Sequence, residues 1–153
     1  MRLHRIALAK HSATAAAAFD GQGGLYGHGR WHIRGKLIAY AADHPALAMA
    51  EALVHLQRSN NIEPFNHWEI EIPDAHILRA PALPAGWKLD LPFTQALGDS
   101  WLGAKSSVAQ WVPSALVPGA FNCLINPAHP KFDLSWVASG PNPFLFDSRL
   151  TRP

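Results

Sequence analysis

The sequence predicts an α+β fold in a single compact domain, and three observations support this. One strongly helical stretch, residues 44–57, stands among several short stretches of strand-like composition. Short strands combined with one strong helix are typical of α+β proteins. The length of 153 residues is that of one domain, and such a chain buries roughly two-thirds of the surface that its unfolded form exposes. We therefore expect residues 1–153 to form one domain.

Two strands and a glycine-rich loop are predicted before the helix. Arg2–Leu8 alternates well enough for a first strand, and residues 36–42 are apolar enough for an interior strand. Between them, residues 20–29 (DGQGGLYGHG) form a loop that bends sharply or approaches a ligand closely. This loop is not a dinucleotide-binding fingerprint, because that motif needs a strand before it and a helix after it.

The helix at residues 44–57 begins with clear signals. Asp43 suits the N-cap position, and Pro45 lies in the first turn, where its missing N–H has no cost. Nearly all faces of this helix are apolar, which predicts burial. Glu51 is the one acid within it, and His55 follows one turn later. A buried carboxylate needs a partner. Glu51 is therefore either a functional acid or a structural one bonded to His55 or to an arginine.

Shorter elements are predicted in the second half of the chain. Trp68, Ile70 and Ile72 alternate with Glu69 and Glu71, as in a half-exposed strand whose glutamates face solvent. Residues 75–91 are proline-rich and irregular. We further expect short helices at 94–102 and 106–111, and strands at 114–117, 121–126 and 144–150.

Composition excludes several classes of protein. The chain has 13 Lys and Arg residues against 11 Asp and Glu, a net charge of +2, and no basic run, which argues against direct nucleic-acid binding. Cys123 is alone, so no disulfide framework or cysteine-based zinc site is expected, and a reducing cytoplasm fits best. No stretch is long enough to span a membrane, and polar residues interrupt the alanine-rich stretch that follows the first strand, which argues against a signal peptide. With 16% charged residues the surface is poor in charge, and a partner is expected to cover part of it.

Three catalytic or binding patterns are weaker candidates. Residues 98–106 resemble a phosphate-binding loop only superficially, because the spacing is wrong and no strand precedes them. Ser114, His55 and Asp147 form a nucleophilic triad only on paper, since no nucleophile elbow surrounds Ser114. Glu51 and His55 have the spacing of two metal ligands, but the sequence identifies no third, and no metal is expected.

Six segments together resemble the RES domain. They are GRW (29–31), IAYAA (38–42), AEALVHL (50–56), VPSALV (112–117), NCLINPAHP (122–130) and FLFDSRL (144–150). The resemblance runs nearly from end to end and lies in the whole set. It implies the toxin of a bacterial toxin–antitoxin pair whose antitoxin is a helix-turn-helix protein of the Xre, ParS or MbcA kind. It also implies a compact fold similar to ADP-ribosyltransferases and an activity that consumes NAD as substrate.

The resemblance also assigns roles to polar residues. Glu51 would stabilise the positive charge that develops when the nicotinamide–ribose bond breaks, as carboxylates do in glycoside cleavage. Arg30 would hold the pyrophosphate, and Tyr40 would stack on nicotinamide. The remaining residues expected at the nucleotide are Trp31, His55, Ser114 and Asn126. For Tyr40 and Ser114, a purely structural role is the alternative.

The type of reaction is open at this stage. The residues Leu47, Ala48 and Met49 precede Glu51 in place of the paired acid that many arginine-specific transferases use, which favours hydrolysis or phosphorolysis of NAD. The alternatives are ADP-ribosyl transfer to a protein, an inactive partner-binding domain, or a serine hydrolase using Ser114. We expect an antitoxin to cover the cleft between Arg30 and Glu51 in a hetero-oligomer. Any DNA contact would then belong to the antitoxin.

Overall fold

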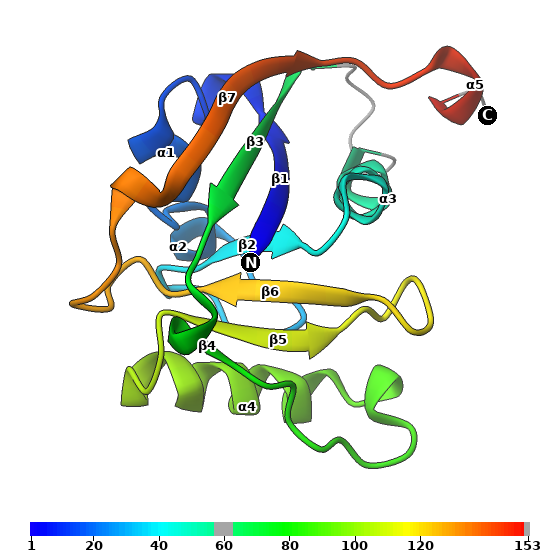
Figure 1. Cartoon of the computed structure of the whole chain (residues 1–153). Helices are drawn as coiled ribbons and strands as arrows, with labels where there is room; N and C mark the ends of the chain where they lie inside the picture. Colours follow the sequence, from blue (N-terminus) through cyan, green and yellow to red (C-terminus); the bar gives the residue numbers. More distant parts are fainter. Residues whose placement is uncertain (57–62, 152–153) are drawn as a thin grey trace.

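Seven strands form one mixed sheet in the computed structural model, which describes residues 1–56 and 63–151 (Figure 1). The strand order is β4-β5-β6-β2-β1-β3-β7, and neighbours are antiparallel except β4 and β5. The strands are β1 (Arg2–Leu8), β2 (Ala39–Ala42), β3 (Phe65–Glu71), β4 (Ile77–Leu78), β5 (Ala109–Pro113), β6 (Phe121–Ile125) and β7 (Val137–Phe144). The sheet has two parts that cross each other, β4-β5-β6-β2 and β1-β3-β7. They join where His4 of β1 pairs with Ala42 of β2.

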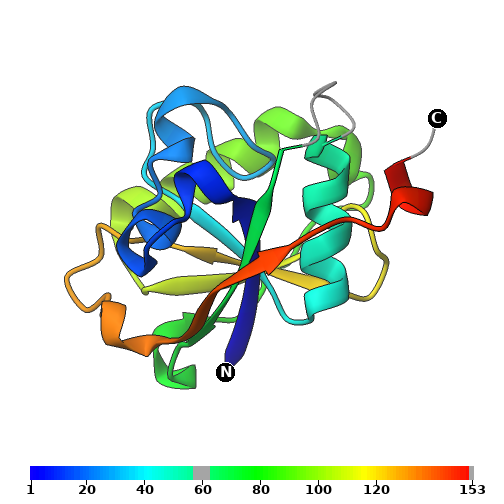
Figure 2. The ribbon, with the colours of Figure 1, turned by 90° about the horizontal axis from the view of Figure 1, so that it is seen from above.

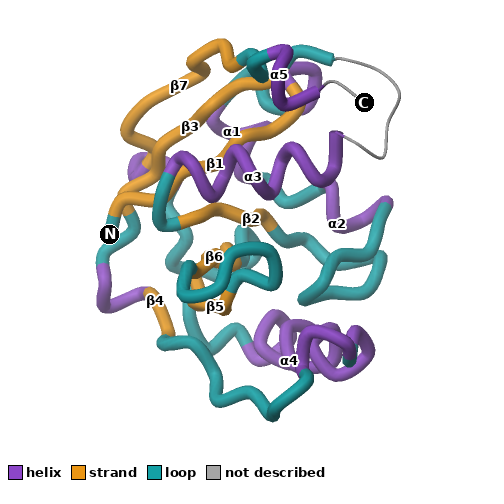
Figure 3. The backbone as a smooth tube through the Cα atoms, turned by 90° about the vertical axis from the view of Figure 1, so that its right-hand side faces the viewer, coloured by secondary structure: helices purple, strands orange, loops and turns teal. Residues whose placement is uncertain are grey.

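The helices cover this sheet on several sides. They are α1 (Ala15–Phe19), α2 (Gly23–Tyr26), α3 (Pro45–Leu56), α4 (Leu91–Ala104) and α5 (Ser148–Thr151), with short 3-10 turns at Ala9–His11, Asp74–His76, Trp87–Leu89 and Leu134–Trp136. Figure 2 shows α3 on one side of the β1–β3–β7 part and α1 on the other. Figure 3 shows α3 running beside β1 and β2, while α4 lies beyond β5 and β6. The α+β expectation is therefore confirmed.

The cores follow from side-chain alternation along the strands. On β1, Leu3 packs with Phe19, Trp68 and Ile70 in the core beneath α1. The opposite face presents Ile6 to α3. The α4 core is separate and contains Trp31, Ile38, Trp101, Leu102, Val112 and Leu124. Within the described residues, no helix is both long and apolar enough to cross a lipid bilayer.

The central helix matches its prediction closely, apart from its cap. It begins at Pro45, and the end predicted at Gln57 lies outside the described residues. The amide of Ala46 donates to His44 Nδ1 at 3.1 Å, and the amide of Ala48 donates to the His44 carbonyl at 3.1 Å. His44, rather than Asp43, therefore occupies the N-cap position.

Several boundaries in the second half were predicted wrongly. Residues 106–111, predicted as helical, contribute to β5, because pairing with β4 and β6 overrides local preference. The predicted strand at 114–117 is a turn. In the first half of the chain, β2 is also shorter than predicted. The last strand lies at Val137–Phe144 instead of 144–150. Its prolines are tolerated because β7 is an edge strand.

Candidate active site

A cavity of about 190 Å³ lies between α3 and the strands β1, β2 and β6. It is lined by His4, Arg5, Ile6, Tyr40, Ala41, Ala42, Ala48, Glu51, Ala52, His55 and Asn122. A larger groove of about 540 Å³ beside β7 is more open, and its lining contains no titratable side chain. The chemistry therefore favours the smaller cavity, which contains the acid singled out from the sequence.

Glu51 is fixed in this cavity by two side-chain donors. Its Oε1 accepts hydrogen bonds from Ser114 Oγ at 3.0 Å and from Asn122 Nδ2 at 2.7 Å. Ser114 Oγ itself accepts from the amides of Leu116 and Val117, at 3.1 Å and 3.0 Å. Its hydroxyl proton is therefore committed to Glu51. The predicted structural partners, His55 or an arginine, are replaced by Ser114, which follows β5, and by Asn122 of β6.

Tyr40 forms part of the cavity wall and is held from behind. Its hydroxyl lies 2.7 Å from His32 Nδ1, and His32 Nε2 lies 3.0 Å from the Gly27 carbonyl. Because a carbonyl only accepts, His32 carries its proton on Nε2, and the tyrosine hydroxyl donates to Nδ1. Burial raises the pKa of Tyr40 and lowers the pKa of His32. A side chain on Gly29 would place its Cβ 2.7 Å from the tyrosine hydroxyl, so only glycine fits there.

Arg5 and Asn122 belong to the cavity but were missed from the sequence. Arg5 Nε donates to the Ala18 carbonyl at 2.7 Å, and its NH1 donates to the Tyr40 carbonyl at 2.9 Å. Burial lowers the pKa of Arg5 to about 10, so it remains a cation at neutral pH. For Arg5, the signal in the sequence was its position two residues after buried Leu3 on the same strand, which places a charged residue on a buried face. For Asn122, the signal was a polar residue within an otherwise apolar strand.

Arg30 lies outside the residues that line the cavity. Its NH1 donates to the Lys88 carbonyl at 3.0 Å, and its guanidinium lies 5.8 Å from the centre of the Trp87 ring. The loop that carries it is anchored to α4, because Gln95 Nε2 donates to the Gly29 carbonyl at 2.9 Å. The structure thus brings Tyr40, Glu51 and Ser114 together but leaves Arg30 on a separate loop.

The other predicted nucleotide ligands are divided. His55 is exposed and lines the cavity at its rim. Trp31 is 2% exposed and packs in the α4 core. Asn126 is also 2% exposed; its amide donates to the Leu102 carbonyl at 3.3 Å, and its Oδ1 accepts from the Ala128 amide at 3.1 Å. Packing and loop bonding, rather than contact with the cavity, account for the positions of Trp31 and Asn126.

The serine triad considered from the sequence is not assembled. Ser114 donates to Glu51 instead of to a histidine. Asp147 forms an ion pair with Arg149 at 2.9 Å, just before α5. Ser114 therefore helps to hold the carboxylate of Glu51 and is not activated as a nucleophile.

Comparison with known proteins identifies the family. The sequence model of the RES domain family matches residues 2–147. The chain belongs to the RES domain family. The relatives of this RES domain include "Toxin Res" of Yersinia enterocolitica, 36% identical over 98% of this chain and 99% of the relative. "Toxin Res" of Pseudomonas putida is 40% identical over 90% of this chain and 95% of the relative.

Two further matches bear on activity and on fold. The "Prs ADP-ribosylating toxin" of a Sphingobium species is 35% identical to this RES domain over 92% of this chain and 94% of the relative. The solved structure of the M. tuberculosis MbcT–MbcA toxin–antitoxin complex contains a similar chain, with a TM-score of 0.70 and 15% identity. That match covers 97% of this chain and 85% of the other. At this identity the structural match shows a shared fold.

Proposed function

We propose that this RES-domain protein is the toxin of a bacterial toxin–antitoxin pair and that it cleaves the nicotinamide–ribose bond of NAD. The observation that carries the proposal is the carboxylate of Glu51, held by Ser114 and Asn122 at the wall of a cavity that Tyr40 also lines. The curated relatives named as toxins support the biological role. The relative named as an ADP-ribosylating toxin supports chemistry at an ADP-ribose donor.

The arrangement suits stabilisation of a cation. Loss of nicotinamide leaves an oxocarbenium-like ribose, and a fixed carboxylate beside it lowers the energy of that state without reorganising. Two donors on one oxygen of Glu51 restrict rotation of its carboxylate, so it is preorganised for this role. Tyr40 is protonated at neutral pH, and burial raises its pKa further; it offers an aromatic face to the nicotinamide ring.

The size of the cavity suggests which half of NAD it holds. A volume of about 190 Å³ is below the roughly 300–1,000 Å³ of pockets that enclose whole drug-sized ligands. We therefore place the nicotinamide riboside half inside the cavity, near Glu51. The pyrophosphate and adenosine would extend outside it, where Arg30 supplies a cation on its separate loop.

The decisive experiment follows release of free nicotinamide from NAD by purified, antitoxin-free protein. We expect Glu51→Gln to lower kcat/KM by at least about a hundredfold, because the amide is neutral but keeps an oxygen that accepts from Ser114 and Asn122. Glu71→Gln is the matched control: this exposed acid, paired with Arg2 at the far end of β3, is expected to leave turnover unchanged. Absence of nicotinamide release from the wild-type protein would refute the proposal.

The acceptor of ADP-ribose is resolved by the products. With NAD labelled in its adenylate half, hydrolysis gives labelled ADP-ribose, and phosphorolysis gives its phosphate ester when inorganic phosphate is supplied. ADP-ribosyl transfer is the second candidate, favoured by the name of the Sphingobium relative, and it would place the label on a protein. We expect the small-molecule products, because acids are absent from the positions that many arginine-specific transferases use.

An antitoxin partner follows from the same proposal. An enzyme that consumes NAD harms its own cell unless its cavity is blocked, and the similar solved structure is that of a toxin–antitoxin complex. We expect a helix-turn-helix protein encoded beside this one to co-purify with it and to abolish nicotinamide release. A co-purified complex that retained full activity would contradict blockage of the cavity.

A further inference from the structure

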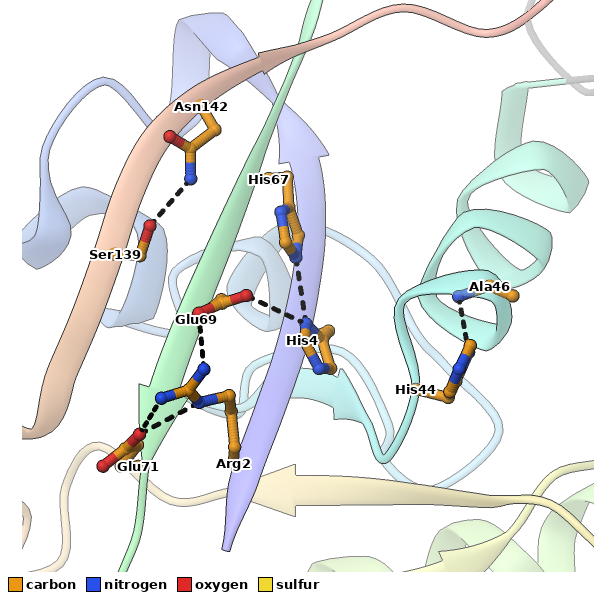
Figure 4. A network of polar contacts seen from close by, with 9 residues as sticks. All are labelled: Arg2, His4, His44, Ala46, His67, Glu69, Glu71, Ser139 and Asn142. Carbon is orange, nitrogen blue, oxygen red and sulfur yellow. Dashed lines mark hydrogen bonds and ion pairs between the residues drawn. The ribbon is translucent and has the colours of Figure 1, made fainter.

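Three metal-ligating side chains converge on the sheet face beside α3, outside the Glu51 network. They are His4 on β1 and His67 and Glu69 on β3, which Figure 4 shows directed toward one another. His4 is paired directly with Glu69 across the two strands, while His67 lies two residues before Glu69 on β3, on the same face. Within the described residues, this is the one group of three or more such side chains whose donor atoms all lie within 4.8 Å of one another.

Two of the three separations between donor atoms are close to those around a tetrahedral ion. His4 Nδ1 lies 3.1 Å from His67 Nε2 and 3.7 Å from Glu69 Oε1. With bonds of 2.0–2.1 Å at the tetrahedral angle, two ligands of a zinc ion are about 3.3 Å apart. These two distances bracket this value, and all three donor atoms lie within 4.8 Å of one another, so rotation of the side chains would bring them around one ion.

The protonation states also favour ligation. One ring nitrogen must donate its proton to the other in the His4–His67 contact, and a cation would replace that proton. Arg2 lies 3.6 Å from Glu69 Oε2, the oxygen not directed at His4, and so orients the carboxylate from outside the group.

We propose that His4, His67 and Glu69 form a binding site for a divalent transition-metal ion of the zinc type. Two imidazoles and a carboxylate form the three-ligand set of open zinc sites, and a water molecule would occupy the fourth position. Calcium and magnesium are disfavoured because they prefer oxygen ligands. His4 lines the Glu51 cavity as well, so the ion would lie at the wall of that cavity. This site differs from the Glu51–His55 pair weighed in the sequence, from which no metal was expected.

The test is a calorimetric titration of tag-free, chelator-treated full-length protein with Zn²⁺ alone. We expect one equivalent to bind with micromolar or tighter affinity, and His67→Gln and Glu69→Gln each to weaken binding by at least about tenfold. His11→Gln is the control, because this exposed histidine lies outside the group and its loss leaves the affinity unchanged. Thermal unfolding of each metal-free variant, compared with the wild-type protein, verifies that it is folded.

A second measurement reports on the ligands directly. Co²⁺ in place of Zn²⁺ is expected to give the intense visible absorption of a tetrahedral or five-coordinate site, and this absorption should be lost in folded His67→Gln. The proposal is overturned if the wild-type protein binds no ion. It is equally overturned if binding persists unchanged in both variants, which would assign the ion to other histidines.

Discussion

The two halves of the candidate site are positioned by different parts of the molecule. The acid wall, formed by Glu51, Ser114 and Asn122, joins α3 to the strands β5 and β6. The arginine loop, residues 27–33, is instead attached to α4. There Gln95 bonds the Gly29 carbonyl, and Asp99 Oδ1 accepts from the Ile33 amide at 3.3 Å.

In the proposed function, the acid wall carries the chemistry and the arginine loop places the substrate. Strand pairing fixes the acid wall, since Ala42 of β2 lies opposite Asn122 of β6 and so directs the asparagine toward α3. The arginine loop contains only an isolated bridge between Gly29 and His32, and its position depends on how it packs against α4. A change in α4 should therefore disturb Arg30 first, whereas a change in the sheet should disturb Glu51 first.

The largest expected effect comes from the contact between α4 and the arginine loop. A methyl group on Gly98 would overlap the Trp31 carbonyl, which is backbone and cannot rotate away. We expect Gly98→Ala to lower the free energy of unfolding by about 3 kcal/mol or more. Urea denaturation followed by tryptophan fluorescence measures this change.

Gly103 provides the matched control on the same helix. A Cβ there meets nothing within 4 Å, and alanine favours a helix over glycine by about 1 kcal/mol. Gly103→Ala should therefore be neutral or slightly stabilising. Equal effects of the two substitutions would show that helix propensity, and not contact with the loop, determines the outcome.

Substitutions of Arg5 and Arg30 compare the sheet with the arginine loop, and we expect smaller changes in the free energy of unfolding. Arg5→Met removes the donors to the Ala18 and Tyr40 carbonyls, and we expect a loss of about 2–3 kcal/mol in the free energy of unfolding. Arg30→Met removes one bond near the surface and should cost less than about 1 kcal/mol. Chemical denaturation of both variants measures the difference. Similar losses would mean that the arginine loop is held as firmly as the sheet.

What the sequence could predict was local. The start of α3 to within one residue and the isolation of Glu51 within it follow from Pro45, helix propensity and periodicity, all of which lie within a dozen residues. The α+β class follows from the same local signals. The sequence also identified Ser114 through family resemblance, although its bond to Glu51 spans 63 positions of the chain.

What the sequence could not predict depends on pairing between distant segments. Asn126 was chosen as a ligand, whereas Asn122 of the same segment bonds Glu51. The two share a strand face but lie about 13 Å apart along it, so the register with β2 decides which one reaches α3. The position of β7 was missed for the same reason: pairing with β3 stabilises a strand whose glycine and prolines look locally unfavourable.

The smallest effect tests a bond between the arginine loop and the cavity wall, the bond of His32 with Tyr40. Burial lowers the pKa of His32 below its ordinary 6.5 in the folded state. As the pH falls below about 6.5, the unfolded chain therefore binds a proton that the folded protein does not, and stability decreases. Denaturation between pH 7.5 and 5.5 should show this loss, smaller than about 1.4 kcal/mol per pH unit. His4 shifts in the same direction, so the wild-type slope contains both residues. We expect a shallower slope in His32→Gln, and an unchanged slope would mean that protonation of His32 does not oppose the link between the halves.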